Sequence, residues 1–376
     1  MTLGAEPPSG SLAGVLPGAL AVLGHADSAD PLGLAGSLGG VRQVVVLLVD
    51  GLGYHLLPAA AQTAPALAAV LAGSAGMLRE LSCAFPSTTP TSLVTLGTGA
   101  LPGAHGVLGF TVNVPGTDRV LTHIDWRDDP PPRTWQPVPR LLEQAAGAGV
   151  STVVVGARGF AGSGLTTAAY GATRYVGTKD VARSVVDELR AGTQLVYGYH
   201  PTLDTTAHLF GIASPQWASA AAEVGRLITH IAERLPRDAA LLVTADHGGL
   251  DVPAEGRFDL DADPRLAAGV RVVAGEPRAR YLHTHDGATD DVLAAWREVL
   301  GDQALVVRRE ELIEAGWFGP VPPEHAARIG DVVVVCLEPA VVLASAHEPA
   351  AVAELVGFHG AITPEETAVP LVAFRT

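Results

Sequence analysis

Residues 43–53 read QVVVLLVDGLG, a continuous apolar run that ends in Asp50 and a glycine-rich turn. The run is rich in β-branched residues and does not alternate with polar ones, which is typical of a strand buried on both faces of a parallel sheet. Similar runs recur at 151–159, 193–200, 239–249 and 330–339. The segments between them have helical character, at 56–72, 90–99, 138–148, 179–190, 203–210, 214–235 and 286–300. This alternation predicts an α/β fold with a doubly wound, mostly parallel central sheet flanked by helices.

The predicted strands divide the chain into three parts. Residues 1–39 precede the first strand and form an N-terminal lead segment. Residues 40–250 and 331–376 hold the predicted strands and form the core of the fold. Residues 269–287, GVRVVAGEPRARYLHTHDG, instead read as two antiparallel strands before a helix. We therefore expect 251–330 to be a small cap-like insertion into the core.

The composition is that of a globular, acidic protein. Of the 376 residues, 48% are hydrophobic and 17% are charged, which argues against a disordered chain, and the formal net charge is -15. No cluster of Lys and Arg is visible, so we expect no binding of nucleic-acid polymers. Cys83 and Cys336 lie far apart in apolar runs and are predicted to stay reduced. The composition leaves the oligomeric state open.

The apolar stretch at 11–24 bears on the location of the protein. It is too short, and too interrupted by Gly and Pro, to cross a bilayer. No basic region precedes it, as one would in a secretory signal. We therefore expect a cytoplasmic protein without membrane contact.

Polar residues follow several predicted strands at the edge where ligands bind in open α/β sheets. Asp50 ends the first run, Asp204 follows 193–200, and Asp246 with His247 follows 239–249. Asp204 and His208 are four residues apart, which places a carboxylate and an imidazole on one face of a helix. Each feature alone also suits a solvated turn or a capping Asp beside a surface His. Together they predict three carboxylates at one sheet edge.

Residues 84–106 read AFPSTTPTSLVTLGTGALPGAHG, and between Phe85 and Leu93 five hydroxyls surround two prolines before a helix-length segment. Pro90 suits the first position of a helix over 91–99. Thr89 would then lie at a helix N-terminus, where backbone N–H groups and the helix dipole favour an anion. The segment on its own allows two interpretations: Thr89 is a helix cap, or it is a nucleophile that attacks a phosphate.

The order of these motifs resembles the nucleotide pyrophosphatase/phosphodiesterase family of the alkaline phosphatase superfamily. The shared elements are an Asp after the first strand, FPSTTP with TGALPGAHG downstream, D-x-x-x-H, DHG and the late His359-Gly. The resemblance covers about 40–376 apart from the cap-like region. It implies an alkaline phosphatase-like fold, two zinc ions, and a covalent phospho-enzyme formed on a threonine.

The resemblance also implies a role for individual residues. Counted from Pro86, the family pattern puts the nucleophile at Thr89, while Ser87 and Thr88 fall out of register. An Asn amide that binds a phosphate oxygen would be Asn113, although its offset from the HG element is not a clean match. The family usually has an aromatic residue and a second proline after the nucleophile, whereas here Pro90 follows Thr89 at once, so the wall of the leaving-group pocket is expected to differ. One zinc would be held by Asp204, His208 and His359, and the other by Asp50, Asp246, His247 and Thr89.

These features predict a zinc-dependent phosphoric-ester hydrolase with a small phosphorylated substrate. Three carboxylates and three imidazoles suit zinc better than calcium, and two divalent ions would neutralise the phosphate in an acidic protein. Phosphodiesterase or nucleotide pyrophosphatase activity, through a phospho-threonine intermediate at Thr89, is the favoured reading. A phosphomonoesterase or phosphonate hydrolase on the same core is the alternative, and a non-catalytic metal-binding protein is the remote one. Trp126 and Trp135 could stack on a base or anchor a loop.

Overall fold

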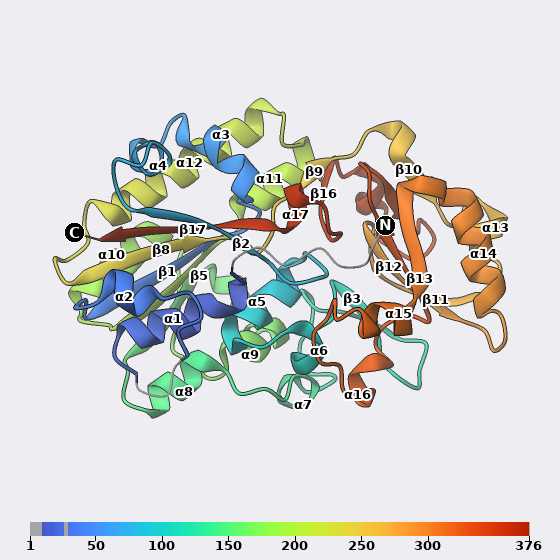
Figure 1. Cartoon of the computed structure of the whole chain (residues 1–376), viewed down its shortest axis with the longest axis horizontal. Coiled ribbons are helices and arrows are strands. Elements are labelled where there is room, and N and C mark those ends of the chain that lie inside the picture. Colours follow the sequence, from blue (N-terminus) through green and yellow to red (C-terminus); the bar gives the residue numbers. More distant parts are fainter. Residues whose placement is uncertain (1–9, 26–28, 376) are drawn as a thin grey trace.

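The computed structural model of the chain describes residues 10–25 and 29–375 (Figure 1). Residues 1–9 and 26–28 of the predicted lead segment, and Thr376, lie outside the described residues. A seven-stranded sheet forms the centre of the larger half of the molecule. Its strands, in spatial order, are β2 (Met77–Ser82), β17 (Ala368–Arg375), β8 (Ala239–Thr244), β1 (Gln43–Val49), β7 (Leu195–His200), β5 (Thr152–Gly156) and β6 (Tyr175–Gly177).

The opening run 43–53 provides the central strand, as its uniform apolarity predicts. β1 pairs in parallel with β7 on one side and β8 on the other, with Val45 opposite Val196 and Leu241. Val44 to Val49 are all buried. β17 adds an antiparallel strand, and β2 pairs with it at the edge. The predicted α/β class and mostly parallel sheet are confirmed.

Helices cover both faces of this sheet (Figure 1). The predicted helix over 56–72 is divided in two, because residues 62–64 form a turn before Pro65. One face carries α3 (Leu57–Ala61), α4 (Pro65–Leu71), α10 (Val181–Arg190) and α12 (Pro215–Ala232). The other face carries α1 (Val15–Val22), α5 (Thr89–Thr98), α8 (Leu141–Gly147) and α9 (Gly164–Tyr170).

A second, six-stranded sheet forms the smaller half, and its extent differs from the predicted insertion at 251–330. It takes strands from both sides of that range. The predicted antiparallel pair is present as β11 and β12, and α14 (Thr289–Leu300) packs on the sheet. The spatial order is β13 (Ala304–Arg308), β14 (Val332–Cys336), β12 (Ala279–Thr284), β11 (Val270–Glu276), β3 (Thr111–Asn113) and β4 (Val120–Thr122).

The prediction that the run at 330–339 lies in the large parallel sheet is wrong. β14 pairs antiparallel with β12 and β13 in the second sheet. Val333 and Val335 pack into the main core, while Val332 and Val334 pack with Trp296 of α14. Both faces of β14 are therefore buried, so the run does not alternate and resembles a parallel strand.

The described residues also bear on two predictions about the chain as a whole. Cys83 and Cys336 are both free and buried, as expected. Across residues 10–25 and 29–375, none of the helices combines the length and the apolar character needed to cross a membrane.

Candidate active site at the carboxyl edge of the large sheet

Three adjacent strands deliver the predicted carboxylates to one place. Asp50 follows β1, Asp246 follows β8, and Asp204 lies on α11 (Thr202–Phe210), which begins just after β7. The glycine after Asp50 allows a close approach, because a Cβ on Gly51 would lie 2.9 Å from the Cβ of Asp204. The structure brings together seven of the eight predicted site residues, and Asn113 is the exception.

A first cluster of ligand atoms surrounds the hydroxyl of Thr89. Its Oγ1 lies 3.1 Å from Nε2 of His247 and 3.5 Å from Oδ1 of Asp50. His247 Nε2 is also 3.4 Å from Asp50 Oδ1 and 3.5 Å from Asp246 Oδ2. One ligand atom from each of Asp50, Asp246 and His247 lies within 4.8 Å of the others. The other oxygen of Asp246, Oδ1, accepts a hydrogen bond from the amide of Gly51 at 3.1 Å and so holds the carboxylate in place.

A second cluster joins Asp204, His208 and His359. His208 Nε2 is 3.2 Å from Asp204 Oδ2 and 3.2 Å from Nε2 of His359. His359 Nε2 is 3.8 Å from Asp204 Oδ1, and its ring stacks on that of His247 with centroids 3.6 Å apart. The stacked rings place the two clusters side by side.

All three imidazoles are oriented by backbone carbonyls. Nδ1 lies 2.8 Å from the carbonyl of Gly357 for His208, of Gly248 for His247 and of Ser87 for His359. A carbonyl oxygen only accepts, so Nδ1 carries a proton, and in the neutral imidazole Nε2 is the atom that can bind a metal ion. Hydrogen bonds of this kind fix the tautomer of metal-ligating histidines.

The donor set fits divalent metal ions. Asp246 Oδ2 is buried without a hydrogen-bond partner, and Nε2 of His208 lies 3.2 Å from Nε2 of His359. Burial, followed by the charges of Asp246 and Asp204, raises the pKa of Asp50 well above its usual range. Unpaired carboxylates so close together are costly, and bound cations would relieve the repulsion.

Thr89 is the first residue of α5, which runs over Thr89–Thr98 rather than the predicted 91–99. Thr88 is the cap residue, although its side chain makes no capping hydrogen bond, and Pro90 is the second helical residue rather than the first. The start of α5 therefore lies at the first cluster, with backbone N–H groups that favour an anion there.

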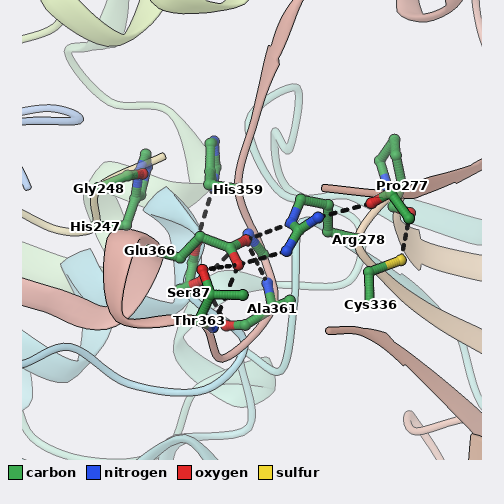
Figure 2. A network of polar contacts seen from close by, with 12 residues as sticks. Ser87, His247, Gly248, Pro277, Arg278, Cys336, His359, Ala361, Thr363 and Glu366 are labelled. Atoms are coloured by element: carbon green, nitrogen blue, oxygen red, sulfur yellow. Dashed lines mark hydrogen bonds and ion pairs between the residues drawn. The ribbon is translucent and has the colours of Figure 1, made fainter. Parts of the chain in front are cut away.

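The loop that carries His359 is held by residues whose role sequence reasoning missed (Figure 2). Ser87, which is out of register for the nucleophile, donates to the carbonyl of Ala361 at 2.8 Å and accepts from the amide of Gly360 at 3.1 Å. Glu366 accepts from the amide of Ala361 at 2.9 Å and from the guanidinium of Arg278. The sequence signal that could have found them is the Thr-Pro-Glu-Glu stretch at 363–366, which is typical of a helix start and forms a capping box at α17 (Pro364–Thr367).

Asn113 lies away from the two clusters. Its Nδ2 donates to the carbonyls of Thr117 and Arg119 at 2.9 and 3.2 Å, so its amide stabilises the turn between β3 and β4. The side chain that reaches the site from this segment is Phe110, which lines the adjoining cavity. Trp126 and Trp135 are buried loop anchors, of which Trp126 donates to the carbonyl of Pro130.

A cavity of 480 Å³ opens beside the clusters. Asp50, Thr89, Asp204, His208 and His359 all line it, so the ligand atoms are accessible from a space large enough for a small molecule. The arrangement combines candidate metal ligands, a hydroxyl and a helix N-terminus on one cavity wall. Such a wall can bind a phosphoryl group and attack it.

Comparisons with known proteins place the chain in a family. Residues 44–362 match the family model for type I phosphodiesterase/nucleotide pyrophosphatase. The chain matches no curated protein sequence.

Three solved structures have a similar fold. Murine ectonucleotide pyrophosphatase/phosphodiesterase 5 has a TM-score of 0.72 at 18% identity, over 89% of this chain and 88% of that one. Its inactive Thr-to-Ala variant in complex with AMP has a TM-score of 0.70 at 17% identity, over 88% and 87%. Phosphonoacetate hydrolase from Sinorhizobium meliloti 1021, in complex with phosphonoacetate, has a TM-score of 0.68 at 21% identity, over 90% and 91%.

Proposed function

The chain belongs to the type I phosphodiesterase/nucleotide pyrophosphatase family, and on that premise we propose that it is a metal-dependent hydrolase of phosphodiester bonds. The observation that carries the proposal is the position of Thr89. Its hydroxyl lies at the start of α5 and within 3.5 Å of both Asp50 and His247. A hydroxyl beside candidate metal ligands and a helix N-terminus suits attack on a phosphoryl group.

Two ions would be held by the two clusters. Asp204, His208 and His359 would bind one, and Asp50, Asp246, His247 and Thr89 the other, as the family resemblance implies. The mixture of carboxylates and imidazoles favours zinc. When bound, the ions would supply positive charge for the phosphoryl oxygens and for the attacking and leaving oxygens.

Thr89 would act as the nucleophile in two steps. Its oxygen forms a bond to phosphorus while the bond to the leaving alcohol oxygen breaks, and that oxygen takes the electron pair. Asp50, toward which the hydroxyl donates, lies in position to accept the proton of Thr89. Water then hydrolyses the phospho-threonine, which restores the hydroxyl and releases the second product. The first turn of α5 would stabilise the developing negative charge.

Separate observations bear on each of the three candidate functions. The inactive murine variant lacks a threonine and binds AMP, which supports a threonine nucleophile in a phosphodiesterase. Phosphonate hydrolysis is the second candidate, because phosphonoacetate hydrolase shares the fold. A non-catalytic metal-binding protein is disfavoured, because all seven predicted metal ligands converge on two adjacent clusters.

The decisive variant is Thr89→Ala. We expect kcat for bis(4-nitrophenyl) phosphate to fall by about 10³-fold or more. Without the Thr89 hydroxyl, water would have to attack the phosphorus directly, and no phospho-threonine intermediate would form. Zinc content, measured by mass spectrometry, should stay near two ions per chain, because six ligands remain. Thr91→Ala is the matched control, since the Thr91 hydroxyl is buried in the same helix without a partner. Comparable turnover by Thr89→Ala, or a zinc-supplemented wild type that neither binds metal nor hydrolyses the diester, would falsify the proposal.

A further inference from the structure

The cavity beside Thr89 has a mainly apolar lining. This lining comes from several distant parts of the chain, so it does not depend on a single loop. The segment from α5 to α9 contributes Leu93, Phe110 and Leu165, and the segment that follows β15 (Val341–Leu343) contributes Val352, Leu355 and Phe358. Such surfaces favour hydrocarbon or aromatic groups of a ligand over hydrated ones.

The tyrosines of the lining present their rings rather than free hydroxyls. Tyr170 donates its hydroxyl to Tyr197 at 2.7 Å, and Tyr175 donates to the carbonyl of Ala157 at 2.9 Å. Tyr199 donates to Oδ2 of Asp50. Because each phenol proton is already used within the protein, these residues add aromatic surface but no donor for a ligand oxygen.

The smaller hydroxyls of the lining are also engaged. Ser163 donates to Thr166 at 3.1 Å, and Thr166 donates to the carbonyl of Phe160 at 2.7 Å. Thr205 donates to the carbonyl of Pro201 at 3.2 Å. A second phosphate or carboxylate of a ligand would therefore find few side-chain donors in this cavity.

Apart from the candidate metal ligands, the ionisable groups of the lining are acidic. Among the described residues that line the cavity there is no Lys or Arg, and residues 1–9, 26–28 and 376 contain neither. Glu348 is neutralised by Arg280 through two hydrogen bonds of 2.6 Å. Glu276 is buried, and its Oε1 has no hydrogen-bond partner. An additional anionic group on a ligand would lose its hydration here without gaining a cation.

We propose that the substrate of this site is a phosphodiester with a single negative charge and apolar or aromatic substituents, and that the cavity discriminates against a second anionic group. Nucleoside di- and triphosphates would then be poor substrates. The inference rests on the proposed phosphodiesterase function and specifies its substrate class.

A matched pair of substrates tests the charge preference. Phenyl 4-nitrophenyl phosphate and its 4-carboxyphenyl analogue release the same leaving group and differ by one carboxylate. For the zinc-loaded wild type we expect kcat/KM to be at least about tenfold higher for the uncharged phenyl ester at low ionic strength. Equal values, or a preference for the carboxylated ester, would overturn the inference while leaving the phosphodiesterase function intact.

A pair of variants links this preference to the cavity. Phe160 and Phe210 are both exposed at the surface, at 41% and 49%, but only Phe160 lines the cavity. Phe160→Arg should reduce the ratio of kcat/KM between the phenyl and carboxyphenyl esters by about fivefold. Added salt should make this reduction smaller. Phe210→Arg should keep the wild-type ratio. If both variants change the ratio equally, the charge of the whole surface determines it and the inference fails.

Binding separates the inference from catalysis. Isothermal titration calorimetry on the zinc-loaded Thr89→Ala variant would compare diphenyl phosphate with 4-carboxyphenyl phenyl phosphate. Tighter binding of diphenyl phosphate, by about tenfold, supports the inference even if the wild type hydrolyses neither ester, a result that would count against the proposed function alone. Equal binding of the two ligands overturns the inference whatever the turnover.

Discussion

Glu276 is a carboxyl group that only tertiary packing places near the site. It ends β11, is 4% exposed, and packs so closely that a Cβ on Gly360 would lie 2.7 Å from its Cγ. Burial raises its pKa to about 8. A carboxyl with a raised pKa keeps its proton in the folded state at pH values where the unfolded chain has lost it.

The free energy of unfolding should therefore depend on pH through Glu276. Between pH 4.5, the ordinary pKa of this carboxyl, and about pH 8, Glu276 is protonated in the folded state but not in the unfolded chain. The contribution of this carboxyl to the free energy of unfolding is therefore fully present below pH 4.5 and is lost as the pH rises through 8. The difference in stability between wild type and Glu276→Gln should fall across this window, by up to about 1.4 kcal/mol per pH unit. Urea unfolding of metal-free protein measures it, with the exposed Glu298→Gln as control. If the free energies of unfolding of wild type and Glu276→Gln change with pH in parallel, the expectation is contradicted.

At the scale of elements, the contact between α5 and α9 sets the position of Thr89. The two helices pack closely at Gly97, where an added Cβ would lie 2.2 Å from the backbone oxygen of Ala169. A side chain there would have to push one helix away from the other, because backbone atoms cannot rotate aside. The glycine is thus required by packing, although glycine weakens a helix interior.

Gly97→Ala distinguishes packing from helix propensity. Propensity alone predicts stabilisation by up to about 1 kcal/mol, whereas the clash predicts a loss of about 2 kcal/mol or more and lower activity. Gly147→Ala is the control, because Gly147 ends α8 and a Cβ there meets nothing within 4 Å. Thermal and urea unfolding of both variants decides the matter. Equal stability of the two would show that α5 and α9 can separate at no cost.

At the scale of the whole molecule, a buried ion pair joins the two sheets (Figure 2). Arg278 lies between β11 and β12 of the smaller half, and Glu366 precedes β17 of the larger half. Their two hydrogen bonds are 2.7 Å long, and neither side chain is exposed. Glu366 also binds the amide of Ala361, so the pair supports the loop that carries His359.

Removal of one partner should be more harmful than removal of both. Arg278→Met leaves Glu366 buried without a cation, and we expect a loss of about 3–5 kcal/mol in the free energy of unfolding together with weaker zinc binding. Arg278→Met combined with Glu366→Gln should recover part of the stability, because no uncompensated charge remains. Denaturant unfolding and zinc titration of the two single variants and the double variant measure this. Strictly additive losses would mean that the pair is not coupled.

The sequence by itself determined the fold class and most of the candidate site. Uniform apolar runs mark strands buried on both faces, and β1, β5, β7 and β8 obeyed that rule. Asp50, Asp204 and Asp246 could be predicted together because adjacent parallel strands end at the same sheet edge. The family resemblance, now confirmed, singled out Thr89 among the hydroxyls and assigned His208 and His359 as metal ligands. Their metal ligation, like the cytoplasmic location, stays a prediction.

Only the tertiary structure decided the rest. The place of β14 depends on which strand it pairs with, and a run buried on both faces reads alike in either sheet. Ser87 and Arg278 act on residues 274 and 88 positions away, and no local pattern encodes such contacts. Asn113 was misplaced because its backbone turn, and not its sequence distance from Gly106, directs the side chain. The apolar character of the cavity likewise arises where distant segments meet, because burial and partner choice belong to the packed chain rather than to any one segment.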